Sequence, residues 1–282
     1  MGDTLYLLRA MGADPVSLHL AHVIEEATGD PVLFICDETR GPVDVGGHRK
    51  IGMTRQDLVA LGFDAPPDNW GWLWGDMCYQ VAAARHPDFD AYCLMESDVF
   101  LPEAGAEDLL ARLEDHPADA IAGRLRRYDE PQKFSRGLAR LGLDPNWGCI
   151  FPVSRITRPV VEVMGELRRR AIRDCPGEKL NDEAMLAGAV QAGGFTHASL
   201  EEIAPDLVSP DTFETNPPHL FEALVARPDE ERLHHPVVTL DTVLERIGSG
   251  QKNYHRHRLR KVLRGADADQ KATIMAALKA NA

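Results

Sequence analysis

The chain opens with apolar runs that alternate with an amphipathic stretch. Residues 4–9 (TLYLLR) form a short apolar run rich in strand-forming residues, and residues 15–27 carry apolar side chains at helical spacing. Asp14 precedes that stretch and Pro15 takes its first position, which is a typical order at the start of a helix. The apolar run of residues 31–38 follows. A strand, a helix and a strand at this spacing predict a parallel α/β unit.

The same patterns predict the elements of the remaining chain. We expect helices at residues 70–85, 104–115, 157–173 and 180–192, strands at 90–102, 119–124 and 146–155, a glycine-rich loop at 39–56, and short strands between proline-rich loops at 195–240. The last forty residues have the pattern of helices. We therefore expect an α/β fold with a mostly parallel central sheet and flanking helices over residues 1–240. A C-terminal helical, basic extension is expected at residues 241–282.

Charge and cysteine content narrow the classes of function. The chain has 31 Lys and Arg against 44 Asp and Glu, a formal net charge of −13, which argues against general binding along a phosphate backbone. Its five cysteines are widely spaced and include no C-x-x-C pair, so they predict neither a disulfide framework nor a zinc site. The first residues lack the pattern of a signal peptide. We therefore expect a cytoplasmic protein.

Basic residues gather near the C-terminus of this acidic chain. The cluster consists of Lys252, Arg256, Arg258, Arg260, Lys261 and Arg264. It is a candidate for peripheral contact with an anionic membrane at the inner membrane face. A solvated helix face explains the same residues equally well.

Two carboxylates end the predicted strand at 90–102. Glu96 and Asp98 are separated by one residue, so on a strand their side chains project on the same side. Ligands of open parallel sheets bind beyond the carboxyl ends of the strands. A carboxylate pair in this place is a candidate for holding a hard divalent cation, which neutralises a diphosphate. The alternative is a buried strand that simply emerges into solvent.

Other residues are weaker candidates. Gly46 and Gly47 precede Arg49 and Lys50, and such a segment is suited to a phosphate group, although a solvated loop is as good an explanation. Asp76 opens the helix before the acidic strand and is a candidate for ribose contact or for a simple dipole interaction. Three tryptophans are spaced by two residues, namely Trp70, Trp72 and Trp74. Core packing is the preferred explanation for them, and stacking on a base or a sugar is the alternative.

Taken together, these motifs resemble the glycosyltransferases of the A-type fold (GT-A), the nucleotide-diphospho-sugar transferases. The resemblance rests on WLWGD (72–76), the segment HPDFDAYCLMESDV (86–99), NWGCIFPVSRIT (146–157), KLNDEAML (179–186) and LHHPVV (233–238), in that order. It covers roughly residues 4–240. The chain departs from the family's D-x-D motif at its first position, where Glu96 stands.

The resemblance implies a function and a set of site residues. It implies a Rossmann-like domain that transfers a sugar from a nucleoside-diphosphate sugar to a hydroxyl on a glycan, lipid or protein, with Mn²⁺ or Mg²⁺ bound. Asp98, Glu96 and a late histidine, His235, are the implied metal ligands. Asp182 or Glu183, at the start of a helix, is the implied catalytic carboxylate. Donor contacts are expected from Arg9, Arg49, Lys50, Asp76 and Glu96.

Two alternatives remain at this point. A nucleotidyltransferase acting on sugar phosphates uses a similar sheet and a divalent cation, but the residues after the first strand, Arg9 to Gly12, do not form a long glycine loop. The second alternative is a protein that binds nucleotide sugars without catalysis. The glutamate at the first motif position is the feature that favours it.

Overall fold

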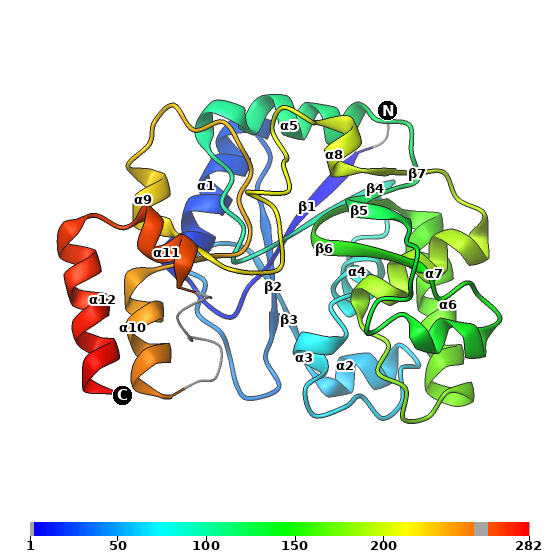
Figure 1. Cartoon of the computed structure of the whole chain (residues 1–282). Helices are drawn as coiled ribbons and strands as arrows, with labels where there is room; N and C mark the ends of the chain where they lie inside the picture. The colour runs from blue at the N-terminus through cyan, green and yellow to red at the C-terminus, as the bar shows by residue number, and fades with distance from the viewer. Residues whose placement is uncertain (1–2, 251–258, 282) are drawn as a thin grey trace. The chain divides into compact units, whose positions relative to one another are not determined.

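The computed structural model describes residues 3–250 and 259–281 of the chain (Figure 1). These residues form two compact units. Unit 1 contains the described residues of Met1–Ala13, Asp30–Glu96 and Ala111–Ala204, and unit 2 contains those of Asp14–Gly29, Ser97–Leu110 and Pro205–Ala282.

Unit 1 is built on a seven-stranded sheet. Its strands are β1 (Thr4–Arg9), β2 (Leu33–Asp37), β3 (Lys50–Met53), β4 (Ala91–Glu96), β5 (Ala120–Arg127), β6 (Trp147–Thr157) and β7 (His197–Ser199). Their order in the sheet is β3-β2-β1-β4-β6-β5-β7. Only β6 runs antiparallel to its neighbours, β4 and β5, and the other pairs are parallel. The predicted α/β fold with a mostly parallel sheet is therefore confirmed.

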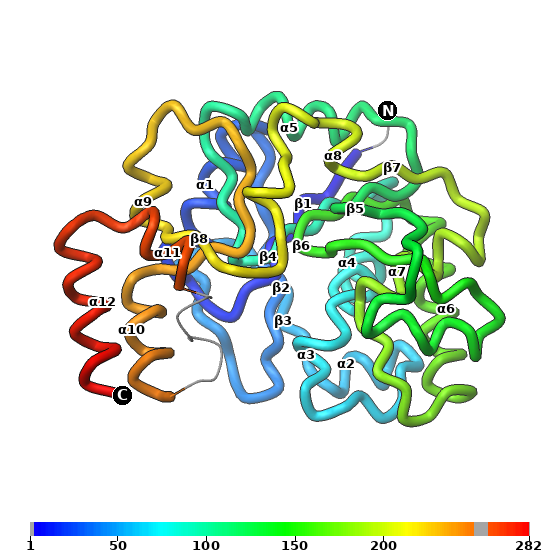
Figure 2. The backbone as a smooth tube through the Cα atoms, viewed as in Figure 1, coloured from blue at the N-terminus to red at the C-terminus, as the bar shows by residue number. Residues whose placement is uncertain are grey.

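One face of this sheet carries the core of unit 1. The helices of the unit are α2 (Arg55–Ala60), α3 (Trp70–Leu73), α4 (Met77–Arg85), α6 (Arg158–Asp174), α7 (Asp182–Gly193) and α8 (Leu200–Ile203), with a 3₁₀ turn at Arg136–Leu141. Alternate strand residues such as Leu5 and Leu7 of β1 point into a cluster with apolar residues of α4, α6 and α7. Figure 2 shows the paths of these helices beside the strands. Alternate residues of a strand share one face, and the residues between them, Tyr6 and Leu8, are buried on the other face.

Unit 2 is mostly helical. Its elements are α1 (Pro15–Thr28), β8 (His219–Leu220), α9 (Phe221–Val225), β9 (Val237–Val238), α10 (Leu240–Gly248), α11 (Arg260–Gly265) and α12 (Ala268–Ala280), and α5 (Glu103–Asp115) runs from unit 2 into unit 1. The predicted start of α1 is confirmed, because the Asp14 carboxylate accepts from the backbone N–H groups of Val16 and Ser17. Helix α1 ends at Gly29, whose φ of 75° is the left-handed conformation that glycine adopts readily.

Two predicted elements were wrong. The segment 39–56 is not only a loop, because it contains β3, which pairs with β2 at the edge of the sheet. A four-residue edge strand is too short to stand out from its glycine-rich surroundings. The expected helix at 70–85 is two helices, α3 and α4, interrupted between Leu73 and Met77. Side chains from other elements hydrogen-bond to the backbone in and beside this break, as described below.

The described part of residues 241–282 consists mainly of the helices α10, α11 and α12. Lys252, Arg256 and Arg258 of the basic cluster lie outside the described residues. Lys261 is not a free basic residue, because its Nζ donates to the backbone carbonyl of Asp211 at 2.7 Å. Among the described residues, no helix is both long enough and apolar enough to cross a membrane.

Candidate active site

Two neighbouring strands of unit 1 end in oppositely charged side chains. Arg9 is the last residue of β1 and Glu96 the last of β4, and the two are register partners in the parallel pair. The guanidinium Nη1 of Arg9 donates to Glu96 and also to Asp182 Oδ2, at 3.2 Å in the second case. Because β1 and β4 are parallel, both residues lie at the carboxyl edge of the sheet, where ligands of this architecture bind.

The break between α3 and α4 supplies the remaining partners of this group. Nη2 of Arg9 donates to the backbone carbonyls of Gly71, at 2.5 Å, and Trp72, at 3.1 Å. The backbone N–H of Gly75 donates to Asp182 Oδ2 at 3.2 Å. A Cβ at position 75 would lie 2.2 Å from both Arg9 Nη1 and Asp182 Oδ2. Only glycine therefore fits at this close approach.

Asp182 is a buried acid at the start of α7. Its side chain is 9% exposed, and its Oδ1 accepts from the backbone N–H of Glu183 at 2.9 Å. Burial raises the pKa of Asp182 to about 8. The positive charge of Arg9 lowers this pKa, but by less than burial raises it, and the nearby Glu96 raises the pKa further. A carboxyl group with this pKa changes its protonation near neutral pH, which suits a proton acceptor.

Arg9 keeps its charge in this buried place. Burial by itself lowers the pKa of Arg9, but the negative charges of Glu96 and Asp182 raise this pKa by more, so the pKa of Arg9 is raised. The guanidinium is thus a permanent cation between two acidic side chains.

Glu183 has different surroundings from Asp182, although the sequence made the two equivalent. Asn181 caps α7 by accepting from the backbone N–H of Ala184 at 3.1 Å. The amide of Asn181 also donates to Glu183 Oε2 at 2.9 Å. Glu183 therefore supports the helix cap, whereas Asp182 joins the group formed by Arg9 and Glu96.

Asp76 is placed inside unit 1 and away from solvent. Its side chain is fully buried, and its two oxygens accept from Arg168 Nε at 3.0 Å and Nη2 at 2.6 Å. Arg168 also donates to the backbone carbonyl of Leu180 and lies over the ring of Trp74. We expected Asp76 to contact a ribose, but both of its carboxylate oxygens are already engaged in a buried ion pair.

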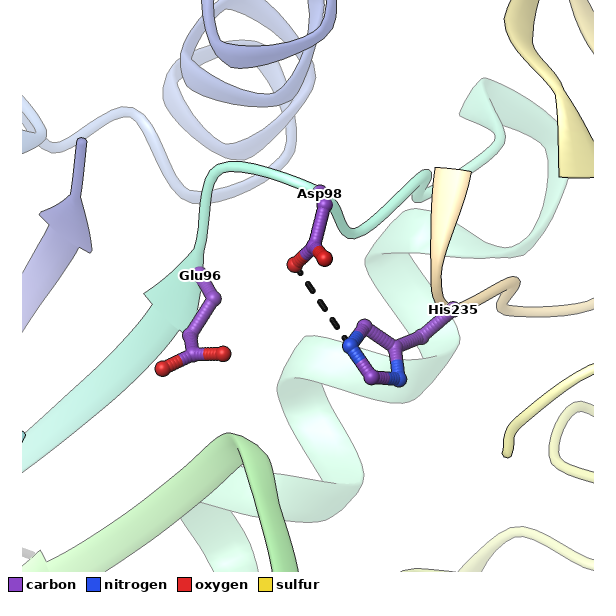
Figure 3. A group of neighbouring side chains, drawn as sticks. All are labelled: Glu96, Asp98 and His235. Carbon is purple, nitrogen blue, oxygen red and sulfur yellow. Dashed lines mark ion pairs between the residues drawn. The ribbon is translucent and has the colours of Figure 1, made fainter. Parts of the chain in front are cut away.

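In unit 2, Asp98 and His235 approach one another (Figure 3). His235 Nε2 lies 3.5 Å from Asp98 Oδ1, and the other ring nitrogen, Nδ1, lies 2.5 Å from the backbone carbonyl of Glu214. A carbonyl oxygen only accepts, so Nδ1 carries a proton. In a neutral ring Nε2 then presents its lone pair to the carboxylate of Asp98.

Glu96 is linked to this pair through the chain itself. Only Ser97 separates Glu96 from Asp98, so their Cα atoms are at most about 7 Å apart. Glu96, Asp98 and His235 each offer one oxygen or nitrogen atom of a type that binds metal ions.

The other predicted donor-binding residues lie elsewhere in unit 1. Lys50 Nζ pairs with Glu38 Oε1 at 2.5 Å. Arg49 precedes β3 and lines a cavity of about 360 Å³ that also contains Thr4 and Tyr6, at the start of β1. The strand starts form the opposite edge of the sheet from Arg9 and Glu96. Neither basic residue joins that group.

Sequence reasoning missed Arg168 and the glycine at position 75 as determinants of this site. A signal for Gly75 was present, because a glycine inside a predicted helix often marks a close backbone contact. Arg168 gave no signal, since one arginine in a basic helix end cannot be told from its neighbours. For the tryptophans, the preferred core packing holds for Trp70 and Trp74, which are 1% and 7% exposed, but not for Trp72.

No family model matches the chain, and no curated protein matches it. Among solved structures it is similar to a putative glucose-1-phosphate thymidylyltransferase from Bacillus anthracis (TM-score 0.41, 9% identity, 70% of this chain and 87% of that one). It is also similar to the galactosyltransferase LgtC (TM-score 0.41, 14% identity, 80% and 79%). A third is a glycosyltransferase involved in glycosylating the major capsid of PBCV-1 (TM-score 0.36, 11% identity, 83% and 92%). Two of these three structures are thus glycosyltransferases, and the other is a nucleotidyltransferase.

Proposed function

We propose that this chain is a metal-dependent glycosyltransferase that moves a sugar from a nucleoside-diphosphate sugar to a hydroxyl acceptor. The proposal is supported by the chain's own residues at the carboxyl edge of the sheet. Arg9 and Glu96 end two parallel strands there, and Asp182 is bonded to the same guanidinium. Asp98 lies two residues after the end of β4.

The observation that carries the proposal is the pair formed by Asp98 and His235. In a neutral His235 the ring proton lies on Nδ1 and is donated to the backbone carbonyl of Glu214. Nε2 and Asp98 Oδ1, which lie 3.5 Å apart, are then both hydrogen-bond acceptors. A bound cation favours this arrangement, and a backbone carbonyl that fixes the other ring nitrogen is a common partner of metal-binding histidines. A protonated His235 bonded to Asp98 is the competing explanation, and it predicts no dependence on metal.

The donor set fits a divalent cation of the Mn²⁺ or Mg²⁺ kind. Asp98, Glu96 and His235 would hold it, and a carboxylate-rich set with one imidazole suits Mn²⁺ well. When bound, the cation would neutralise the charge that develops on the departing diphosphate.

Within unit 1 we assign separate roles to the charged residues. Asp182, once ionised, accepts the proton of the acceptor hydroxyl. Arg9 positions Asp182 and Glu96 rather than binding phosphate, because its two terminal nitrogens already donate to four oxygens. Donor contacts of Arg49, Lys50 and Asp76 remain predictions.

The proposal is tested by thermal unfolding with UDP, GDP, CDP and dTDP, each with Mn²⁺ or with EDTA. We expect one nucleotide to stabilise the protein only with Mn²⁺, by about 2.7 kcal/mol at 100 times its dissociation constant. Asp98→Asn should remove most of this stabilisation. Asp229→Asn, the same change at an exposed position of unit 2, should not.

Stabilisation that is equal in EDTA, or unchanged in Asp98→Asn, would contradict the metal site. Product analysis then separates the enzyme classes. A glycosyltransferase releases a nucleoside diphosphate, whereas a nucleotidyltransferase releases pyrophosphate from a nucleoside triphosphate and a sugar phosphate. Nucleotide binding without either product would indicate the non-catalytic alternative.

A further inference from the structure

The indole of Trp72 is an exposed aromatic surface that the proposed chemistry does not use. It is 62% exposed, whereas Trp70 and Trp74 on either side of it are buried. A large aromatic side chain gains much from burial, so an exposed one at the edge of a site often marks a contact surface. The other tryptophan of the chain, Trp147, is partly buried.

A second aromatic residue extends this surface. The rings of Trp72 and Phe134 lie edge to face, with their centroids 5.9 Å apart and an interplanar angle of 74°. The ammonium of the exposed Lys133 lies 4.9 Å from the centre of the Phe134 ring. Trp72 and Phe134 are referred to below as the aromatic shelf.

The shelf is tied to the proposed catalytic carboxylate. The backbone carbonyl of Trp72 accepts from Nη2 of Arg9 at 3.1 Å, and Nη1 of the same guanidinium donates to Asp182 at 3.2 Å. Three residues after Trp72, the N–H of Gly75 donates to Asp182 as well. The guanidinium group of Arg9 thus bridges the backbone carbonyl of Trp72 and the carboxylate of Asp182.

We infer that the aromatic shelf binds a sugar ring of a saccharide acceptor. The inference rests on the proposed function, and it selects the saccharide among the possible acceptors. One face of a pyranose ring consists of C–H groups with partial positive charge, which pack on the negative face of an indole ring. The ammonium of Lys133 is suited to donating hydrogen bonds to hydroxyl oxygens of the same sugar.

Position favours the acceptor over the nucleotide base of the donor. In a nucleoside-diphosphate sugar, a ribose and two phosphates separate the base from the carbon that reacts. The acceptor hydroxyl, in contrast, must lie directly at that carbon and at the carboxylate that takes its proton. Because the backbone of Trp72 shares the Arg9 guanidinium with Asp182, we assign the shelf to the acceptor ring.

The test measures saccharide binding without any donor, on an array of immobilised oligosaccharides. We expect wild-type protein to bind a subset of them and Trp72→Ala to bind that subset about tenfold more weakly or worse. Trp72→Phe should retain most of the binding. Val59→Ala, which truncates another exposed apolar side chain of unit 1, is the matched control and should bind as wild type.

Nucleotide binding of each variant is measured in parallel by thermal unfolding with Mn²⁺. A Trp72→Ala variant that keeps its saccharides, or a wild-type protein that binds none, overturns the inference. Loss of nucleotide binding with unchanged saccharide binding also overturns it and places the base on the shelf. Because the array contains no donor and no metal, its result is independent of whether the proposed transfer reaction is correct.

Discussion

Asp182 and Glu183 are adjacent in the chain but differ in what their carboxylates contact. Asp182 accepts from Arg9 and from the backbone N–H of Gly75, and it is almost fully buried. Glu183 accepts from the side chain of Asn181, the residue that caps α7. Adjacent residues on a helix point about 100° apart, so only one of them can face the group at the sheet edge. Their contacts identify Asp182 as that one.

Replacing Asp182 should therefore affect turnover far more than replacing Glu183. We expect Asp182→Asn to lower kcat at least a hundredfold while the nucleotide still binds, because an asparagine amide cannot take up the proton of the attacking hydroxyl. Glu183→Gln should retain nearly full turnover and lose about 1 kcal/mol of stability or less through the weakened cap. Steady-state kinetics and nucleotide titrations of both variants measure this. Equal rates for the two variants would refute the assignment.

A buried ion pair joins helices α4 and α6. Asp76 opens α4 and Arg168 lies within α6, and the two side chains are 0% and 2% exposed. The bidentate geometry satisfies both carboxylate oxygens. Because α4 follows directly after the break that contacts Arg9 and Asp182, the pair also fixes the direction in which the chain leaves that break.

Breaking this pair on one side should destabilise the protein strongly. Arg168→Met leaves the Asp76 carboxylate buried without its cation, at an expected cost of about 3–5 kcal/mol in the free energy of unfolding. The double variant Asp76→Leu with Arg168→Met should recover much of the loss, since no buried charge remains. Urea denaturation of the wild type, the single variants Asp76→Leu and Arg168→Met, and the double variant measures the coupling.

A ribose-binding role for Asp76 predicts a different outcome. In that case Asp76→Asn would weaken nucleotide binding with little change in stability. The control for Arg168→Met is Arg173→Met, which removes one positive charge from an exposed arginine in the last turn of α6.

At the scale of the whole molecule, buried titratable groups link folding to pH. In unit 1, burial raises the pKa of Asp182 to about 8. In unit 2, burial lowers the pKa of His219 to about 3 and that of His234 to about 4. The histidines favour folding in their neutral form, so their contribution is lost as pH falls from about 6.5. Asp182 favours folding in its protonated form, so its contribution is complete below pH 4 and is lost as pH rises through about 8.

Stability should therefore decline between about pH 6.5 and 8.5 in the wild type, and less so in Asp182→Asn. Over this range the folded protein holds a proton on Asp182 that the unfolded chain has already released, so unfolding releases a proton. The histidines contribute little to this decline, because their ordinary pKa lies at or below its start. Chemical denaturation at several pH values measures the two slopes. Parallel curves for the two proteins would show that Asp182 is ionised throughout.

The local pattern of the sequence was enough to predict most of the elements and the α/β class. Continuous apolar runs marked the buried strands, and Asp14 marked the start of α1, because caps and periodicity act between residues close in sequence. The same local reasoning selected Glu96 and Asp98, since a polar pair after an apolar strand is visible in the sequence. It failed for β3, whose four residues have too short a pattern.

Only the tertiary structure decided which of these residues meet. Arg9 and Asp182 are 173 residues apart, and no local pattern links them. The break between α3 and α4, the burial of Asp76 against Arg168 and the exposure of Trp72 between two buried tryptophans depend on packing between distant elements. In and beside this break, distant side chains hydrogen-bond to backbone groups of Gly71, Trp72 and Gly75. The sequence by itself determined most of the elements and the candidate metal ligands, whereas long-range contacts decided which carboxylate lies beside Arg9.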